Sequence, residues 1–315
     1  MRELIFIEPV FKETIWGGKR LHDDYGYDIP SDHTGECWAI SAHPNGDCRI
    51  ASGEYKGMTL SELYKEHGEL FGSNGTGEFP LLVKIIDAKA DLSIQVHPDD
   101  VYAAKHENGS LGKTECWYIL DCDEDAQIVI GHNAKDHEEV KEMIENKRWD
   151  EFIRVVPVHK GDFFQIVPGT VHAIKAGTVI LETQQSSDVT YRVYDYDRLQ
   201  NGKPRDLHIK QSIDVIRAPF VPDTALKKTE KILDANVTTL VECEYYRVKK
   251  IDLEGETVID ENASFVNVSV LEGEGKAGDI RLKKGMHFIA PCGYGPLKLS
   301  GNMMLIISAV PQRQK

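Results

Sequence analysis

The sequence has few cysteines, a shortage of basic residues and no long apolar run. Its 315 residues include 6 cysteines, and because none belongs to a Cys-x-x-Cys pair we expect reduced thiols rather than a disulfide scaffold. The 37 lysines and arginines stand against 51 aspartates and glutamates, and the net charge of −14 disfavours a nucleic-acid-binding protein. The longest apolar stretches, such as residues 303–310, are far shorter than the ~20 residues that span a bilayer. We therefore expect neither a nucleic-acid partner nor a membrane partner.

Two further absences narrow the class of protein. The first residues carry Glu3 and Glu8 and lack the apolar core of a signal peptide, so we expect a cytoplasmic location. The chain has no Gly-x-Gly-x-x-Gly loop and no alternation of strands with helices, which argues against a dinucleotide-binding fold. With 41% hydrophobic and 28% charged residues it is typical of a folded soluble protein, and its length suggests about two domains.

Short β-type runs separated by Gly, Pro, Asn and Asp dominate the chain and predict a sandwich or a barrel. The expected strands are residues 81–86, 92–97, 116–120, 126–130, 163–167, 178–183, 189–194, 245–251, 265–271 and 303–308. Helical spacing predicts only a few helices, at 60–71, 99–108, 136–149 and 208–217. A domain boundary is expected within 218–234, where Pro219 and Pro222 precede a new series of strands. The Gly, strand, Pro and Gly pattern of 161–169 returns at 285–293, which suggests two related β-domains.

One predicted strand places three polar side chains on a single face. Alternate residues of a strand point to opposite faces, so within 92–97 the side chains of Ser93, Gln95 and His97 lie together. The intervening apolar side chains, beginning with Leu92, are expected to point into a hydrophobic layer. The polar face is either solvated surface or the lining of a polar cavity.

Two other segments supply residue types that bind metals. Lys113 and Glu115 share one face of the next expected strand, and a Pro-Gly turn delivers His172 to the start of another. His97, Glu115 and His172 together offer two nitrogens and a carboxylate, which with an open position is the pattern of a catalytic zinc site. Gln95 offers an additional neutral oxygen. Each of these residues taken singly is more often an ordinary surface or core residue than a metal ligand. The hypothesis of a metal site therefore depends on their combination.

The segment 182–192 follows an apolar strand and combines acids, amides and an arginine. Arg192 has two alternatives: a structural salt bridge with Glu182 or Asp188, or presentation of its planar guanidinium to a phosphate or sugar oxygen. The residues by themselves do not decide between the two.

These segments resemble the type I mannose-6-phosphate isomerases (phosphomannose isomerases) in their short bacterial form. The matching blocks keep the family's order between residues 16 and 192 and comprise Trp16-Gly17-Gly18, Leu92-Ser93-Ile94-Gln95-Val96-His97-Pro98-Asp99, Gly112-Lys113-Thr114-Glu115-Cys116-Trp117, Pro168-Gly169-Thr170-Val171-His172-Ala173 and the segment 182–192. The resemblance implies a mainly β, double cupin fold, with two β-barrel or jelly-roll domains and a small helical insertion. The expected domains are an N-terminal metal-binding cupin at 1–235, with the insertion at about 99–154, and a C-terminal cupin-like domain without metal at 236–315.

The resemblance also implies the activity. Members of the family are zinc-dependent aldose–ketose isomerases that interconvert mannose 6-phosphate and fructose 6-phosphate by proton transfer between C1 and C2 through an enediol or enediolate. One zinc ion per chain is implied, with His97, Glu115 and His172 as ligands and Gln95 as the fourth. The family's arginine near the active centre matches Arg192.

The other expected roles follow from this implied chemistry. Arg192 would stabilise charge on the substrate oxygens, Glu182 or Asp188 would shuttle protons, and Lys113 would act as an acid or bind the substrate. The expected substrate-binding residues are Ser93, Lys113 and Asp188. The expected partner is a small sugar phosphate, and the chain is expected to be a monomer or a weak homo-oligomer.

Two other functions are compatible with the same residues. One is a different metal-dependent cupin enzyme, either another sugar-phosphate isomerase or an oxygenase whose iron is held by two histidines and a carboxylate. The other is a sugar-binding cupin without catalysis, against which the presence of Glu182, Arg192 and the ligand set argues.

Overall fold

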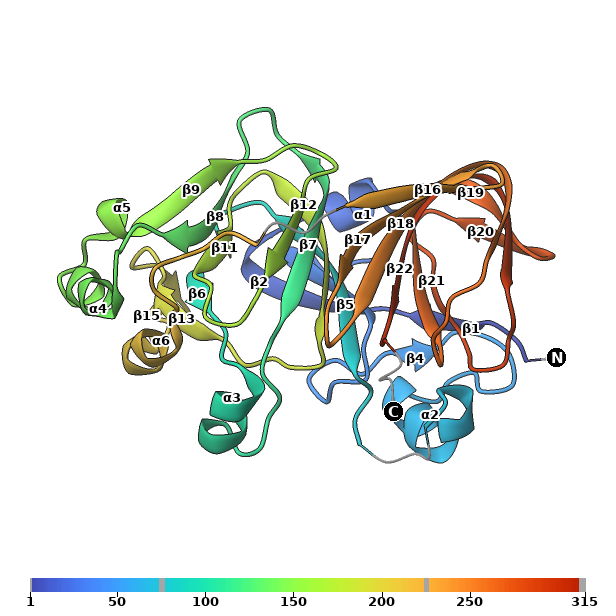
Figure 1. Ribbon diagram of the computed structural model, residues 1–315, viewed down its shortest axis with the longest axis horizontal. Helices are drawn as coiled ribbons and strands as arrows, with labels where there is room; N and C mark the ends of the chain where they lie inside the picture. The colour runs from blue at the N-terminus through green and yellow to red at the C-terminus, as the bar shows by residue number, and fades with distance from the viewer. Residues whose placement is uncertain (1, 74–76, 224–226, 312–315) are drawn as a thin grey trace.

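The computed structural model describes residues 2–73, 77–223 and 227–311 and consists of two β-barrels that lie side by side (Figure 1). Strands dominate both barrels, and the few helices lie at their edges, so the prediction of a mainly β protein is confirmed. Within the described ranges, no helix combines the length and apolar character needed to cross a membrane.

Two antiparallel sheets form the N-terminal barrel. The first sheet has, in spatial order, the strands β10 (Phe163–Ile166), β7 (Glu115–Cys122), β12 (Thr178–Gln185), β5 (Leu81–Ala88), β2 (Val10–Gly18) and β3 (Thr34–Ile40). The second has β13 (Tyr191–Tyr194), β6 (Ile94–Val96), β11 (His172–Ile174), β8 (Gln127–His132) and β9 (Ile153–Pro157). Apolar side chains of both sheets, such as Trp117, Ile128 and Ile180, form one buried cluster between them. The two sheets therefore enclose a common interior.

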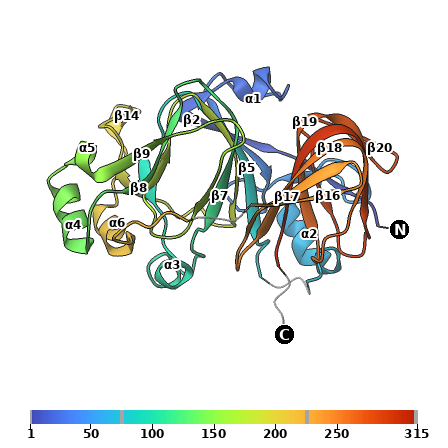
Figure 2. The same ribbon diagram turned by 45° about the horizontal axis from the view of Figure 1, so that its top comes forward.

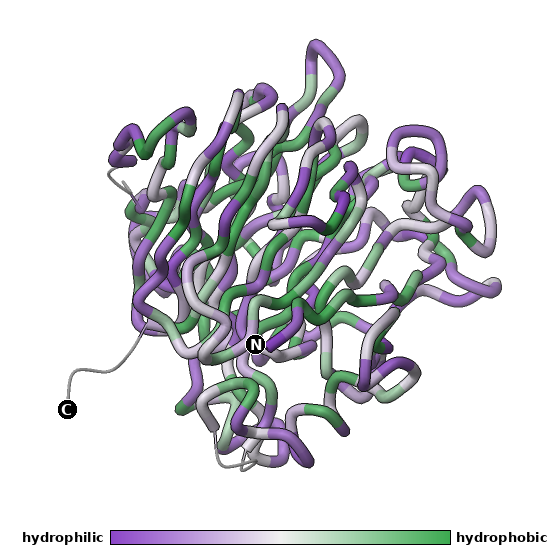
Figure 3. The backbone as a smooth tube through the Cα atoms, turned by 90° about the vertical axis from the view of Figure 1, so that its right-hand side faces the viewer, coloured by the Kyte–Doolittle hydropathy of each residue, from purple (hydrophilic) through white to green (hydrophobic). Residues whose placement is uncertain are grey.

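A nine-stranded antiparallel sheet forms the C-terminal barrel. Its spatial order is β16 (Lys228–Ile232), β17 (Ala235–Glu242), β18 (Arg247–Ile259), β22 (Leu297–Ala309), β19 (Val266–Ala277), β21 (His287–Ala290), β1 (Ile5–Glu8) and β4 (Arg49–Ile50), with β20 (Ile280–Lys283) paired to β19. Figure 3 looks onto this barrel and shows hydrophobic stretches along the strands and hydrophilic stretches in projecting loops. Val270, Phe288 and Leu305 belong to the cluster that fills its interior.

The N-terminal segment contributes to the C-terminal sheet. Ile5 of β1 pairs with Ile289 of β21, and Ile7 pairs with Ile50 of β4. The division of the chain at residue 235 stays a prediction. The pairings show that two short N-terminal strands, β1 and β4, complete the C-terminal barrel.

The predicted helices are present. They are α2 (Leu60–Glu66) with the 3₁₀ helix η1 (Gly68–Leu70), α3 (Asp100–His106), α4 (His137–Glu145), α5 (Trp149–Phe152) and α6 (Ile209–Val215), to which the short α1 (Arg20–Asp23) is added. Val140 and Ile144 of α4 share a buried cluster with Ile94 and Val96 of β6, and residues of α5 and α6 belong to the same cluster, so these three helices cover the outer face of the five-stranded sheet (Figure 1). Because the barrel strands β7 and β8 separate α3 from α4, the helices between 99 and 154 are not one continuous insertion.

Alternation along β7 separates an interior face from a face between the barrels. Cys116 and Tyr118 pack in a cluster that includes Val248 and Ile306 of the C-terminal barrel. Trp117 lies in the interior cluster of the N-terminal barrel instead. Since side chains alternate along a strand, Glu115 shares the interior face with Trp117. Figure 2 shows the two barrels meeting along β5, β7 and β17.

The start of α2 offers a direct test of local stability. The Thr59 hydroxyl accepts a hydrogen bond from the Glu62 N–H at 3.2 Å, and the Glu62 carboxylate accepts one from the Thr59 N–H at 2.9 Å. We expect Thr59→Ala to lower the free energy of unfolding by about 1 kcal/mol, because it leaves the N–H of Glu62 without its acceptor. Chemical denaturation measures this change. Lys65→Ala, at an exposed position of the same helix, is the control and is expected to stay within about 0.5 kcal/mol of wild type. An equal loss in both variants would contradict the prediction.

Candidate metal centre and active site

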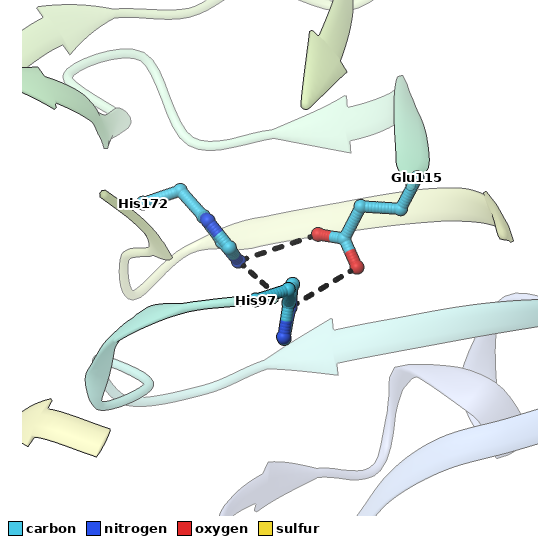
Figure 4. A group of neighbouring side chains, drawn as sticks. All are labelled: His97, Glu115 and His172. Carbon is cyan, nitrogen blue, oxygen red and sulfur yellow. Dashed lines mark hydrogen bonds and ion pairs between the residues drawn. The ribbon is translucent and has the colours of Figure 1, made fainter. Parts of the chain in front are cut away.

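Three strands bring the candidate ligands together inside the N-terminal barrel. His97 follows the last residue of β6, Glu115 begins β7 and His172 begins β11. β6 and β11 are neighbours, and Gln95 of β6 stands directly opposite His172. The two histidines and the glutamate are buried, with at most 1% of each side chain exposed. Residues separated by up to 75 positions therefore meet at one point of the barrel interior (Figure 4).

The ligand atoms form a compact triangle. Nε2 of His97 lies 3.1 Å from Nε2 of His172, and each of these nitrogens lies 3.4 Å from one oxygen of Glu115. A tetrahedral zinc ion with bonds of about 2.0–2.1 Å would separate its ligand atoms by about 3.3–3.4 Å. The spacing of the triangle matches that requirement.

The hydrogen bonds of the two rings establish which nitrogens face the triangle. Nδ1 of His97 lies 2.9 Å from the carbonyl oxygen of Val189, and Nδ1 of His172 lies 2.8 Å from that of Thr170. A carbonyl oxygen only accepts, so each Nδ1 donates its proton and each neutral ring directs the lone pair of Nε2 into the triangle. Histidines that bind a metal through one ring nitrogen usually donate the N–H of the other nitrogen to such an acceptor.

The centre of the triangle faces a carboxylate and two nitrogen lone pairs, which are groups that attract a cation. Oε1 of Glu115 accepts no hydrogen bond from any described residue, Oε2 faces the Lys113 ammonium, and two nitrogen lone pairs face each other at 3.1 Å. Burial, followed by the nearby Lys113 ammonium, lowers the pKa of His97 to about 3. Burial also lowers the pKa of His172. Because the imidazoles resist protonation, a divalent metal ion fits this donor set better than protons do.

Lys113 supplies a positive charge beside the triangle. Its Nζ lies 2.8 Å from Oε2 of Glu115, 3.3 Å from Nε2 of His97 and 3.9 Å from Oε1 of Glu182. Burial alone would lower the pKa of Lys113, but Glu115 and Glu182 raise it above its ordinary value. Burial disfavours ionisation of Glu115, yet Lys113 and the two histidines hold the pKa of that carboxyl well below its usual range. The carboxylate is therefore available as an anionic ligand.

A second carboxylate lies next to the first. Glu182 of β12 stands between Trp117 of β7 and Lys84 of β5 in the strand register. The Trp117 indole donates to Oε2 of Glu182 at 3.0 Å, and Lys84 Nζ lies 3.6 Å from Oε1. Burial and then the charge of Glu115 raise the pKa of Glu182. A raised pKa makes a carboxyl a better proton carrier than an ordinary, fully ionised one.

A cavity of about 400 Å³ opens beside these groups. Ser93, Gln95, Lys113, Glu182 and Arg192 line it. The cavity thus joins the polar face predicted for residues 93–97 with the arginine of the segment 182–192. Its wall also carries the exposed Asp188, which accepts a hydrogen bond from the Asn45 side chain at 3.0 Å.

Arg192 is positioned by the strand register. It stands opposite Gln95, which on its other side stands opposite His172, so the three residues share one row across β13, β6 and β11. The guanidinium donates to the backbone oxygen of Asp206 at 2.7 Å, and its buried Nε has no hydrogen-bond partner among the described residues. Among the described residues, Arg192 forms neither of the predicted salt bridges, with Glu182 or with Asp188. Its side chain lines the cavity instead.

The alternation predicted for residues 92–97 is correct from Ser93 onward and wrong for Leu92. Ile94 and Val96 pack under the helices, whereas Leu92 belongs to the barrel interior and lines the cavity together with Ser93. The strand begins only at Ile94, so the period of two does not extend back to Leu92.

Several cavity residues were not singled out from the sequence as site residues. They are Glu36, Lys84, Gln200 and Arg205, together with Trp16 of the first matching block. Lys84 carried a usable signal, because a lysine inside the apolar run 81–86 has to find a partner when the strand is buried. Arg205 carried none, since it reaches the cavity through the hairpin of β14 (Leu199–Gln200) and β15 (Lys203–Pro204).

The fold and the site define a class of protein: a double cupin whose N-terminal barrel encloses a His, Glu and His cluster that is able to hold a metal ion. The chain belongs to the type I phosphomannose isomerase family. The model of the phosphomannose isomerase type I catalytic domain matches residues 4–118, and that of the mannose-6-phosphate isomerase cupin domain matches residues 236–310.

Individual relatives match almost the whole chain. Mannose-6-phosphate isomerase ManA of Bacillus subtilis is 52% identical over 97% of this chain and 98% of its own length. The mannose-6-phosphate isomerase of Streptococcus mutans is 47% identical over 98% of both chains. A crystal structure of mannose 6-phosphate isomerase from B. subtilis superimposes with a TM-score of 0.95 at 48% identity, covering 98% of this chain and all of that one. The predicted family and double cupin fold are confirmed.

Proposed function

We propose that this protein interconverts mannose 6-phosphate and fructose 6-phosphate and that it does so with one bound zinc ion. The observation that carries the proposal is the triangle of His97, Glu115 and His172 ligand atoms, 3.1–3.4 Å apart, buried beside a cavity lined with acids and cations. The relatives described above are named for this isomerisation, and they match both barrels rather than one.

The proposed ligands are His97, Glu115 and His172, with the side-chain oxygen of Gln95 as the fourth. A divalent ion bound there would polarise the carbonyl oxygen of the open-chain sugar and stabilise negative charge on the sugar oxygens. Two neutral imidazoles and one carboxylate suit zinc, which needs no redox chemistry for this task.

The proton transfers are assigned to the chain's own side chains. Glu182 has a raised pKa and is proposed to move a proton between two positions of the substrate, while the Lys113 ammonium, 3.9 Å away, stays protonated and would bind the substrate oxygens. Arg192 lines the cavity and has a buried Nε without a partner among the described residues, and its guanidinium would stabilise charge on the substrate oxygens. Asp188 lies at the more exposed wall and is proposed to contact the substrate.

The substrate is proposed to occupy the cavity of about 400 Å³. Ser93 offers a hydroxyl, and Lys113, Arg192 and Arg205 offer cationic donors that match the oxygens of a phosphorylated sugar. The sugar phosphate is the only partner that this site requires, and a monomer or weak homo-oligomer stays a prediction.

Chelation followed by metal rescue tests the proposal. A coupled assay on mannose 6-phosphate is expected to lose nearly all turnover when the metal is removed, because the charge stabilisation of several kcal/mol that the ion supplies disappears. Adding zinc is expected to restore turnover at one ion per chain. Addition of metal is also expected to raise the unfolding temperature of the metal-free protein, since an ion that binds only the folded state stabilises it.

Other outcomes would replace the proposal. Oxygen consumption that depends on ferrous iron would favour a cupin oxygenase. Metal-dependent sugar binding without product would favour a binding protein. Product formation that is unaffected by complete removal of metal would reject the metal-dependent mechanism.

A further inference from the structure

The loop that joins α3 to β7 carries Lys113 into the active site, and its backbone is held from outside the cavity. We propose that Asp100, itself held by Tyr245 of the C-terminal barrel, is a positioning residue for Lys113. The inference rests on the proposed function, because it concerns how Lys113 is presented to the substrate cavity.

Asp100 connects three separate parts of the chain. Its Oδ1 accepts hydrogen bonds from the Gly112 N–H at 2.8 Å and from the side-chain amide of Gln185 at 3.0 Å. Its Oδ2 accepts a hydrogen bond from the Tyr245 hydroxyl at 2.9 Å. One carboxylate at the start of α3 therefore joins the Lys113 loop, the end of β12 and the C-terminal barrel.

The backbone on both sides of Lys113 is fixed by this arrangement. Gly112 precedes Lys113 and donates to Asp100, while the N–H of Thr114 donates to Oε1 of Gln185 at 2.8 Å. The N–H of Lys113 itself donates to the carbonyl oxygen of Pro98 at 3.0 Å. Three consecutive N–H groups thus have defined acceptors, and two of those acceptors belong to the Asp100 and Gln185 pair.

Residue 112 also approaches the start of α3 too closely for any side chain. A Cβ at Gly112 would lie 2.4 Å from the carbonyl carbon of Asp99 and 2.5 Å from the N of Asp100. These are backbone atoms, so they cannot move aside as a flexible side chain would. The close contact is independent of the hydrogen bonds and holds the loop in the same place.

Lys113 needs such positioning because its own side chain is flexible. An ammonium on a four-carbon chain has many rotamers, and ordering it costs conformational entropy. In the structure Lys113 is 5% exposed and its Nζ lies within 3.9 Å of His97, Glu115 and Glu182. A shift of the backbone at residues 112–114 would move the ammonium relative to all three groups.

The contact with Tyr245 gives the C-terminal barrel a part in the active site. All described residues that line the cavity of about 400 Å³ lie between residues 13 and 205. Tyr245 is not among the lining residues of this cavity; it lies in the turn between β17 and β18, and with Asp100 it lines an adjoining cavity of about 930 Å³. The second barrel therefore acts on the reaction through Asp100 and the Lys113 loop, without touching the substrate.

Single substitutions along this chain of contacts test the inference on the metal-loaded, full-length protein. Asp100→Ala is expected to lower kcat on mannose 6-phosphate about tenfold or more, because a misplaced catalytic group loses effective concentration. Tyr245→Phe removes only one hydroxyl and is expected to lower kcat about threefold. In both variants KM is expected to stay within about twofold of wild type and the metal content to stay at one ion per chain.

Two further variants separate positioning from general stability. Asp100→Asn keeps an acceptor for Gly112, and the Tyr245 hydroxyl can rotate to accept from the new amide, so kcat is expected to recover to within about threefold of wild type. Tyr102→Phe is the matched control. Tyr102 lies in α3, as Asp100 does, and its hydroxyl donates to Asp214 at 3.0 Å. The substitution removes this tyrosine-to-aspartate hydrogen bond without changing a contact of the Lys113 loop, so kcat is expected to stay unchanged.

The outcomes are distinguishable. The inference is overturned if Tyr245→Phe and Asp100→Ala lower the unfolding temperature while kcat stays at the wild-type value, or if Tyr102→Phe lowers kcat equally. If Asp100→Ala does not fold, Tyr245→Phe and Asp100→Asn decide the question. A wild-type protein that makes no product from mannose 6-phosphate would instead reject the proposed function.

Discussion

His97→Ala is expected to yield a folded protein that neither retains a divalent metal ion nor isomerises mannose 6-phosphate. The substitution removes one corner of a buried triangle whose other corners, His172 and Glu115, lie 3.1 and 3.4 Å away. Two remaining ligands hold zinc poorly, and the loss of about 4 kcal/mol of charge stabilisation corresponds to a ~10³-fold lower rate. Metal analysis of the purified variant and the coupled assay measure the two effects.

A matched histidine provides the control for this experiment. His137 is exposed at the start of α4, far from the cavity lining, so His137→Ala is expected to keep both metal and rate. Glu115→Gln keeps the shape of its side chain and removes the charge, and it is expected to behave like His97→Ala. Full metal content with normal turnover in His97→Ala would show that the triangle is not the metal site.

Arg192→Ala is expected to keep the metal and lose mainly the rate, with kcat about 10²- to 10³-fold lower, as for other donors that stabilise developing charge. Arg192 lines the cavity, stands opposite Gln95 and has a buried Nε without a partner among the described residues. Burial, and then the neighbouring Arg205, lower its pKa, yet an arginine stays charged at neutral pH. Steady-state kinetics together with metal analysis separate this effect from loss of the ion.

Two further variants sharpen the result. Arg192→Lys keeps the charge but not the planar fork, so a partial recovery of kcat is expected if charge is the main contribution. Arg148→Ala removes an exposed guanidinium that pairs with Glu142 and Glu151, and its rate should equal that of wild type. A loss of metal in Arg192→Ala, or a normal rate with normal metal content, would contradict the proposed role.

Much of the fold was predictable because strand and helix signals are local. The apolar run 81–86 became β5, and the helical spacing of 136–149 became α4, which ends at Glu145. The prediction was less exact where pairing partners decide the boundaries, as at Leu92, which lies just before β6. The positions of β1 and β4 in the C-terminal sheet had no local signal, because the partner of a short strand is decided by the assembled core.

The sequence predicted which types of residue form the candidate site, but only some of the individual residues. His97, Glu115 and His172 were grouped from the sequence, and the structure brings them together. Lys113 and Glu182 lie beside this group, and their catalytic roles stay predictions. Gln95 as the fourth ligand stays a prediction, as do the roles of Ser93 and Asp188 in substrate binding.

The sequence by itself determined the alternation of strands, the polar face of residues 93–97 and the kinds of ligand on offer, since these depend on neighbours within a few positions. Only the tertiary structure decided that His97 and His172 direct their Nε2 atoms at each other, that Arg192 binds the backbone of Asp206, and that Tyr245 of the second barrel reaches Asp100. These contacts join residues 14 to 145 positions apart. Their geometry follows from how the sheets close and pack, because strand register and barrel contact are properties of the whole assembled chain.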